Sequence, residues 1–580
     1  MILNRIMSSA IVLLLLTAGP APAGNATIPG EITVPYPTIT NLAVEWRIDG
    51  DDNLDSSVTV RYRRAGQSRW RTATPLFRVP GGGNTLMTSG GKEMTFPWDN
   101  KHSGSIFDLR PDSEYEIELT LTDPDGGSAK KTVRGKTRPV PRPAPNATVK
   151  PANPRTFKTV MAGAVPGDII ELTPGYYYDF EAVTDGEAGK PIVIRSDGGS
   201  AFDALSLRGR SHVHIEGFTV FDGIDLLGGK HLTVRRCTVT ARYGITATSP
   251  PGAENCYIAD NTVTYVMPWE AVGMGSGHVH GGAANLGEGI QITGPGNVIC
   301  HNYVKGYRDC ISTMEGPGVH NQVCIDIYNN DIYVGADDAI EADFCSHNCR
   351  IMRNRITNCC MGLSSQPGLG GPNYFIRNVM YNIVLSPYKL QRGSVGDVII
   401  HNTTVKVGDG LACRTETAWS RAYFRNNLSI GGVGGGVYGR YSNGTGMAVF
   451  FPGADQTCDL DYDAVGTYLT PFAGQIGDIK FETIEEMKKL TTEKHAVQVD
   501  MTVFNGVPFP YPPVPEREPP DLRPVPGSTV VDSGFPLANI NDGFKGSAPD
   551  IGAYEAGQEL PLYGPRPKGV DEATTWREKN

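Results

Sequence analysis

The feature that most constrains the fold is a column of asparagines that recurs along the middle of the chain. Short apolar stretches such as IYNN, FIRN and IIHN each end on an asparagine, and five of these asparagines lie 24 residues apart. They are Asn330, Asn354, Asn378, Asn402 and Asn426. Asn302, Asn261, Cys237 and Gly217 extend the column toward the N-terminus. Because a unit this short cannot bury its own apolar face, we expect the units to stack on one another.

A turn asparagine that recurs in every coil can hydrogen-bond the backbone and the asparagine of the next coil, provided that the coils are parallel and directly stacked. The LxxLxL frame of leucine-rich repeats, which have a similar period, is absent. On this asparagine ladder, the chain resembles the right-handed parallel β-helix of pectate-lyase-like proteins from about Asn153 to Gly432. The resemblance implies a substrate groove along the first sheet of the helix.

The N-terminal part of the chain has a different pattern. Apolar and polar residues alternate from Ile32 to about Lys136, which predicts short antiparallel strands with one buried face. Tyr115 in LRPDSEY resembles the tyrosine corner of fibronectin type III modules, in which the hydroxyl bonds nearby backbone. The predicted fold class is therefore all-β, a right-handed parallel β-helix preceded by a small antiparallel β-sandwich. We expect the sandwich to be a spacer or accessory module.

The two ends of the chain suggest export and a covering segment. Arg5, the apolar run AIVLLLLTAG and the small residues APA follow the order of a secretory signal peptide. A proline-rich stretch separates the two β regions, and FETIEEMKKLT predicts a short helix that Thr483 caps. We expect a signal peptide over 1–23, a fibronectin-like β-sandwich over 24–136, a linker over 137–154, the β-helix over 155–432, and a cover segment with a proline-rich tail over 433–580.

The formal net charge of −10, with no block of Lys or Arg, lacks the basic surface of a nucleic-acid binder. The N-terminal apolar run is too short to span a bilayer comfortably, so no membrane insertion is expected after the signal peptide is removed. We predict a secreted or periplasmic monomer. A polysaccharide is its expected partner.

A second apolar strand follows each asparagine turn, and its centre can be aligned from coil to coil. The aligned centres include Ile290, Ile311, Ile340, Leu363 and Leu390. Two positions before the centre, successive coils carry Glu288, Asp309 and Asp338, and Glu341 stands one position after it. Coils stack about 4.8 Å apart, so these carboxyl groups should form a vertical file. Like charges this close do not all stay ionised. One carboxyl group of the file should therefore have a raised pKa, or the file should hold a cation.

Asp309 and Asp338, with Asp337 beside it, resemble the acidic core of polygalacturonase-type glycoside hydrolases. Lys389 and Arg392 in YKLQRG resemble the basic pair with which that family holds a uronate carboxylate. The chain departs from that family at Met361, where the family has a histidine, and at YRD, where it has NTD. The resemblance implies that Asp309, Asp337 and Asp338 are catalytic and that Arg392 binds substrate. We also predict that Lys389 is catalytic, and that Glu288 and Glu341, from their positions in the file, bind substrate.

Three functions remain open from the residues alone. In a hydrolase of an acidic glycan, which we favour, one protonated carboxyl donates to the leaving oxygen while another activates water, and no cofactor is required. In a polysaccharide lyase, Lys389 with a lowered pKa would be the base, and Arg392 or a Ca²⁺ held by Asp337, Asp338 and Glu341 would neutralise the uronate. In a glycan- or surface-binding protein, the acids would be ordinary turn residues.

An inserted glycine-rich loop, MPWEAVGMGSGHVHGG, precedes Glu288 and is expected to overhang the groove. Trp269 offers a flat surface for a sugar ring. His280, with His278, offers a hydrogen-bond donor or an acid–base group. We therefore add Trp269 and His280 to the predicted substrate-binding residues.

Overall fold

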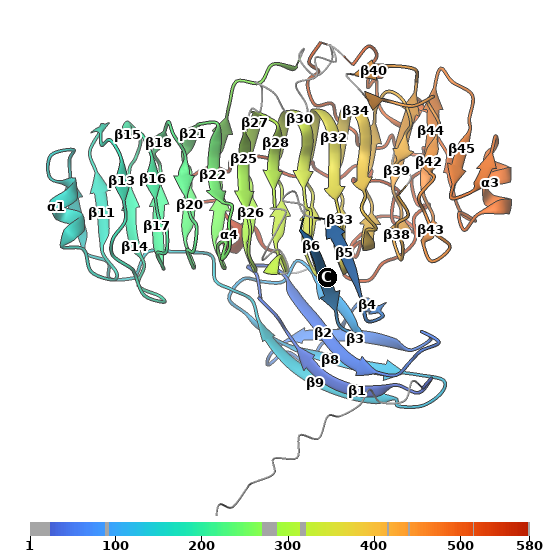
Figure 1. Cartoon of the computed structure of the whole chain (residues 1–580), viewed down its shortest axis with the longest axis horizontal. Helices are drawn as coiled ribbons and strands as arrows, with labels where there is room; N and C mark the ends of the chain where they lie inside the picture. Colours follow the sequence, from blue (N-terminus) through green and yellow to red (C-terminus); the bar gives the residue numbers. More distant parts are fainter. Residues whose placement is uncertain are drawn as a thin grey trace, which may run out of the picture.

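The computed structural model of the chain describes residues 24–577 except 88–91, 270–286, 314–320, 414–416, 439–440 and 514. The described chain is almost entirely β-structure. An antiparallel sheet from the N-terminal part lies against the flank of a long stack of parallel coils (Figure 1). The predicted fold class, a parallel β-helix preceded by a small antiparallel β-sandwich, is confirmed. No helix in the described part of the chain is long and apolar enough to cross a membrane.

The N-terminal sheet has the strand order β1-β2-β7-β4-β3-β8-β9, and β5 and β6 pair separately as a hairpin. Its alternating residues bury one face, with Trp46, Val60 and Ile117 in the core. The Arg110 amide donates to the Tyr115 hydroxyl at 2.9 Å, which is the backbone bond predicted for this tyrosine. The strands are β1 (Ile28–Thr33), β2 (Leu42–Asp49), β3 (Ser57–Arg64), β4 (Arg71–Val79), β5 (Gly82–Met87), β6 (Glu93–Trp98), β7 (Lys101–Ile106), β8 (Glu114–Thr122) and β9 (Ala129–Lys136).

Each coil of the β-helix contributes to two large parallel sheets. The thirteen-stranded sheet contains β10 (Val149–Ala152), β11 (Ile169–Leu172), β14 (Ile192–Arg195), β17 (Val213–Glu216), β20 (Thr233–Arg235), β23 (Tyr257–Ala259), β26 (Val298–Cys300), β29 (Asp326–Tyr328), β31 (Arg350–Met352), β33 (Leu369–Ile376), β35 (Val395–Ile400), β38 (Tyr423–Arg425) and β43 (Asp459–Asp461). Aliphatic side chains from both sheets fill the interior of the coil. The N-terminal sheet packs on the outside of this thirteen-stranded sheet.

The nineteen-stranded sheet carries the candidate site. Its strands are β12 (Gly175–Tyr176), β13 (Phe180–Glu181), β15 (Ser200–Phe202), β16 (Leu205–Ser206), β18 (Thr219–Val220), β19 (Ile224–Asp225), β21 (Thr238–Thr240), β22 (Tyr243–Ala247), β24 (Thr262–Thr264), β25 (Glu288–Ile292), β27 (Tyr303–Tyr307), β28 (Asp309–Ser312), β30 (Asp331–Glu341), β32 (Arg355–Ser365), β34 (Val379–Leu390), β36 (Thr403–Val405), β39 (Leu428–Gly432), β44 (Ala464–Tyr468) and β47 (Val497–Gln498).

The ends of the helix are capped. Helix α1 (Phe157–Ala162) buries Phe157 and Met161 at the first coils, and α3 (Ile484–Leu490) lies at the opposite end (Figure 1). The predicted N-cap is confirmed, because the Thr483 side chain accepts a hydrogen bond from the Glu486 amide.

The predicted asparagine ladder is confirmed along most of its length. The Asn354 amide group donates to the Asn378 side-chain oxygen at 2.9 Å and to the Ile327 carbonyl at 3.0 Å. Equivalent side-chain bonds join all members of the series in the described chain. In order, they are Asn261, Asn302, Asn330, Asn354, Asn378, Asn402, Asn427 and Asp463. Each coil thereby satisfies the buried turn polar groups of its neighbour.

Two predicted ladder positions are wrong by one residue. Asn426 has a φ of 60° and belongs to the column of left-handed residues that precedes the ladder, as do His301 and Arg353. Asn427 occupies the ladder, because this coil is one residue longer and presents two consecutive asparagines. Gly217, with a φ of 85°, also belongs to the left-handed column.

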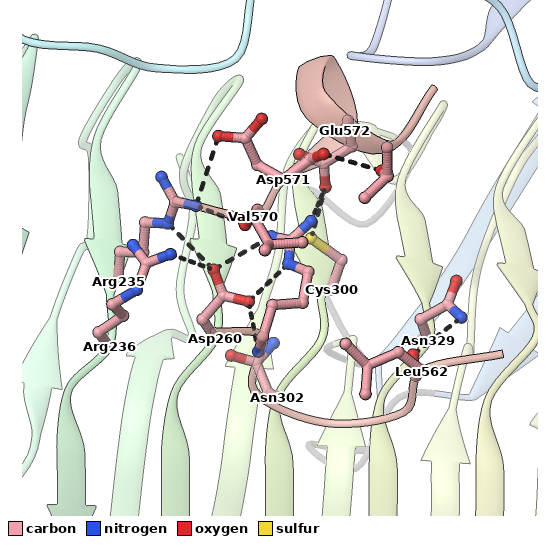
Figure 2. Close-up of polar contacts among 12 residues, drawn as sticks. Arg235, Arg236, Asp260, Cys300, Asn302, Asn329, Leu562, Val570, Asp571 and Glu572 are labelled. Atoms are coloured by element: carbon pink, nitrogen blue, oxygen red, sulfur yellow. Dashed lines mark hydrogen bonds and ion pairs between the residues drawn. The ribbon is translucent and has the colours of Figure 1, made fainter. Parts of the chain in front are cut away.

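The C-terminal segment returns along the outside of the coils and contacts β20, β23 and β26. There Arg566, Asp571 and Glu572 form a group that we call the C-terminal clasp, with α4 (Glu572–Thr575) at its end. Figure 2 shows Asp571 and Glu572 of this group. The Arg566 guanidinium donates to Asp260 at 2.7 Å and to Glu572 at 2.9 Å. These buried charges are fully paired, which fastens the tail to the helix.

Candidate functional site

The candidate site lies on the outward face of β25, β28, β30, β32 and β34. In these strands the aliphatic centres Ile290, Ile311 and Ile340 point into the coil and are buried, so the residues beside them point outward. Glu288 stands in register with Asp309. Ser312 stands in register with Glu341. Parallel stacking therefore brings carboxyl groups from three coils to one surface, as the sequence predicted.

The structure corrects the predicted alignment of the coil that carries Lys389. Tyr388, and not Leu390, is in register with Leu363, so Lys389 follows Glu341 and Ser364 in one vertical file. The prediction placed Gln391 there. A shift of two residues leaves the same side chains facing outward, so the alternating pattern could not distinguish the two alignments.

The acidic side chains are tightly grouped. Carboxylate oxygens of Asp309, Asp338 and Glu341 all lie within 4.8 Å of one another. The Asp338 amide donates to the Asp309 carboxylate at 2.9 Å. The register between β30 and β32 shifts between Gly335 and Asp338, where a bulge inserts Asp337 before Asp338. The sequence GADDAIEAD thus supplies two of the three clustered acids from one strand.

Two cationic side chains hold the acids in place. The Lys389 ammonium donates to the Asp338 carboxylate at 2.6 Å. The Arg308 guanidinium donates to Asp309 and to Glu288, both at 2.7 Å. Arg308 was not predicted as a site residue, although its position directly before Asp309, at the corner that leads into the site strand, could have identified it.

Burial determines the protonation of the cluster. Burial and the charge of Asp309 raise the pKa of Glu288 to about 9 and that of Asp337 to about 6. Burial also raises the pKa of Asp338 to about 7, although the Lys389 ammonium opposes it. Burial and the charge of Asp309 also raise the pKa of Glu341 well above its usual range. Near neutral pH the cluster therefore contains protonated carboxyl groups beside charged ones.

The predicted lowered pKa of Lys389 is wrong. Burial disfavours the ammonium, but the charges of Asp338 and Asp337 outweigh burial and raise the pKa of Lys389 well above its usual range. Lys389 is therefore a stable cation and is poorly suited to remove a proton from a sugar.

The donor set also bears on the predicted Ca²⁺. Three carboxylates offer the hard oxygen ligands that Ca²⁺ prefers, although the group contains Asp309 where the prediction had Asp337. However, Lys389 and Arg308 already bond Asp338 and Asp309 at 2.6 and 2.7 Å. Two cations this close compensate the negative charge and would repel a third. The cluster therefore does not fit a calcium site.

The other predicted binding residues have different outcomes. Trp269 is buried among Tyr333, Val334 and Met361, and its indole N–H donates to the Pro513 carbonyl at 3.0 Å. This placement contradicts the predicted open sugar platform. His280 and His278 lie outside the described residues. Arg392 is exposed in the turn that follows β34.

A cavity of about 680 Å³ continues the same surface toward the N-terminal coils. Glu181, Ser206, Asp225 and Thr246 line it, and they stand in successive register in the file that leads toward Glu341. Tyr243 is in register with Glu288 and is 46% exposed. Its ring is a partly exposed aromatic surface beside the acidic cluster, with the Arg242 guanidinium 5.5 Å from the ring centroid, and the sequence prediction assigned it no role.

Comparisons with known proteins find matches only among solved structures. No protein-family model and no curated protein matches the chain. Among solved structures, pectate lyase Pel9A matches with a TM-score of 0.41 at 15% identity, covering 70% of this chain and 96% of that one. A Yersinia enterocolitica family 28 exopolygalacturonase matches with a TM-score of 0.33 at 11% identity, covering 78% and 98%. The fold and the cluster define the chain as a parallel β-helix protein with a carboxylate-rich outward face.

Proposed function

We propose that the protein is a polysaccharide-degrading enzyme that hydrolyses glycosidic bonds of an acidic glycan. The observation that carries this proposal is the carboxyl cluster on the outward face of β25, β28 and β30. It combines acids of raised pKa with carboxylates bonded to cations within one small volume. General acid–base hydrolysis needs such a pair, with one carboxyl protonated and another able to accept a proton.

The contacts and pKa values support a proposed role for three of the acids. Asp337 and Asp338, with pKa values of about 6 and about 7, are the candidate proton donors to the leaving glycosidic oxygen. Asp309, oriented by Arg308 and by the Asp338 amide, is the candidate base. As the C–O bond breaks, the acid protonates the leaving oxygen, water adds its oxygen to the anomeric carbon, and the base takes the remaining proton.

The cations support an acidic substrate. Lys389 and Arg308 border the cluster, and Arg392 is exposed in the adjoining turn. A uronate carboxylate beside the scissile bond would be attracted to these groups. The cavity and the exposed ring of Tyr243 extend the surface so that several sugar units can bind along the coils. Export from the cell, which the first 23 residues predict, would suit a polymer substrate.

The raised pKa of Lys389 weighs against proton abstraction by this residue, and so against the lyase that the sequence left open. The decisive experiment incubates the protein with a panel of uronate-containing polysaccharides and measures new reducing ends, new ultraviolet absorbance and retention of the polysaccharide by the protein. New reducing ends without new ultraviolet absorbance support hydrolysis. Absorbance from an unsaturated product supports elimination, and retention without cleavage supports a binding protein.

Variants connect the activity to the cluster. Asp309→Asn and Asp338→Asn should each reduce kcat by at least about 100-fold, since each removes an acid–base group. Glu485→Gln, at an exposed position on α3 and outside the site, is the control and should retain most of the activity. Full activity in both cluster variants would contradict the assignment.

A further inference from the structure

The N-terminal sheet is attached to the β-helix by buried polar contacts. The Asn348 amide group donates to the Ser103 hydroxyl at 3.0 Å, and the Ser105 hydroxyl donates to Asn348 at 2.9 Å. Arg350 donates to Ser105 at 3.0 Å. Since buried hydrogen bonds of this kind have a defined geometry, they fix the sheet in one position on the coils.

The β5–β6 hairpin extends from this sheet to the turns that follow the site strands. Phe96 of β6 packs edge-on against Phe344, with ring centroids 5.3 Å apart. Phe344 directly follows Asp343, whose carboxylate accepts from Ser364 in the site file at 2.6 Å. The Trp98 ring lies so close to Gly370 that a Cβ there would stand 2.7 Å from it. The hairpin is thus in direct contact with the turns at the edge of the site.

One hairpin residue contacts the turn that carries Arg392. The Asn84 amide group donates to the Arg392 carbonyl at 2.9 Å and to the Gly393 carbonyl at 3.1 Å. Both turn residues are left-handed, with φ values of 54° and 73°. For arginine this conformation costs free energy, so the turn depends on contacts that hold it. Asn84 supplies two such contacts from a residue 308 positions away in the sequence.

We propose that Asn84 is a positioning residue for Arg392, so that the N-terminal sheet forms part of the substrate site and sets its affinity for an anionic glycan. The inference rests on the proposed function for the substrate, whereas the positioning itself rests on the contacts alone. By holding the backbone at Arg392, Asn84 limits the directions in which the guanidinium can reach a sugar carboxylate.

The test compares the full-length protein with Asn84→Ala, Asn84→Asp and Thr85→Ala. Asn84→Asp keeps the shape but replaces the donor with an anion that faces two carbonyls, and so should act at least as strongly as Asn84→Ala. Thr85 is the adjacent exposed residue, bonded to Thr95 within the hairpin at 3.0 Å, and is the matched control. Asn84→Gln keeps the amide donor and should therefore change hydrogen exchange and KM less than Asn84→Ala does.

Two measurements are made on each variant. Hydrogen exchange of peptides covering residues 391–394 should become faster in Asn84→Ala and Asn84→Asp but not in Thr85→Ala. With a uronate polysaccharide that the wild type cleaves, KM should rise about threefold to tenfold while kcat changes little. Unchanged exchange at 391–394 would overturn the positioning role, even if the wild type cleaves no glycan. Faster exchange with unchanged KM would overturn the link to substrate affinity.

Discussion

At the scale of single residues, the site is built from charges that the fold keeps out of water. Glu288 illustrates how keeping such a charge out of water affects stability. Its carboxyl is buried beside Asp309, and both effects favour the protonated form. Arg308 and Ser312 hydrogen-bond this carboxyl but do not offset its burial. A site that needs protonated acids near neutral pH therefore accepts a loss of stability at higher pH.

Glu288→Gln should weaken the dependence of stability on pH. Because the folded-state pKa of about 9 lies above the unfolded value near 4.5, the folded protein binds more protons between these limits, and its stability falls as pH rises through this window. The wild type should lose roughly 3–6 kcal/mol between pH 5 and pH 9 from this group, and Glu288→Gln should lose much less. Thermal unfolding across this range measures the difference.

Glu485→Gln serves as the control, because Glu485 is exposed on α3. Its stability profile should follow that of the wild type. Parallel profiles for Glu288→Gln and the wild type would show that Glu288 does not carry the protonation assigned to it.

At the scale of elements, the coils depend on the asparagine ladder. Asn354 is fully buried, donates two hydrogen bonds and accepts two from Asn330. Asn354→Ala leaves these partners buried without a bond, so the free energy of unfolding should decrease by about 2–4 kcal/mol. Denaturant unfolding measures the decrease. Thr240→Ala, at an exposed strand position, should change stability by less than about 0.5 kcal/mol.

The sequence could predict those elements that repeat. The ladder, the coil direction and the file from Glu288 to Asp338 all follow from a period that recurs in every coil. The errors at Asn426 and Leu390 arose where a neighbouring residue satisfies the same pattern, either a second asparagine or another buried inward position two residues away. Nothing local distinguishes these alternatives.

Contacts between distant segments could not be predicted. Trp269 is covered by Pro513, which is 244 residues further along the chain. Asn84 reaches Arg392 across 308 residues. Such pairings depend on how the tail and the N-terminal sheet pack on the coils, and no periodic pattern encodes that packing. Arg308, which orients Asp309, was missed for another reason, because it lies at a corner outside the aligned strand positions although it directly precedes Asp309.

At the scale of the whole molecule, the N-terminal sheet and the C-terminal tail both pack on the outside of one long coil. The tail ends in the C-terminal clasp, where Asp571 and Glu572 lie beside Arg235 and Asp260 (Figure 2). Tyr257 and Tyr328 donate to Glu572 at 2.9 and 2.7 Å. The clasp connects the end of the chain to coils more than 200 residues earlier, so it should stabilise the molecule as a unit.

Glu572→Gln tests the clasp. Burial opposes ionisation of Glu572, but the Arg566 charge and the Tyr328 hydrogen bond prevail and lower its pKa to about 2. The stabilisation is therefore present above the unfolded pKa near 4.5 and is lost as pH falls toward 2. At neutral pH, Glu572→Gln should destabilise the tail by about 3 kcal/mol. Faster hydrogen exchange over residues 560–577 would show this destabilisation, and exchange at the wild-type rate would contradict the role of the clasp.

The central claim is that the carboxyl cluster hydrolyses a glycosidic bond with water as the second reactant. The most direct measurement cleaves a uronate-containing polysaccharide in water enriched in oxygen-18 and determines the mass of the products. Hydrolysis predicts one labelled oxygen at each new reducing end and none at the new non-reducing end, with no labelled product when Asp309→Asn replaces the wild type. Products that carry no label and contain an unsaturated sugar would contradict the claim.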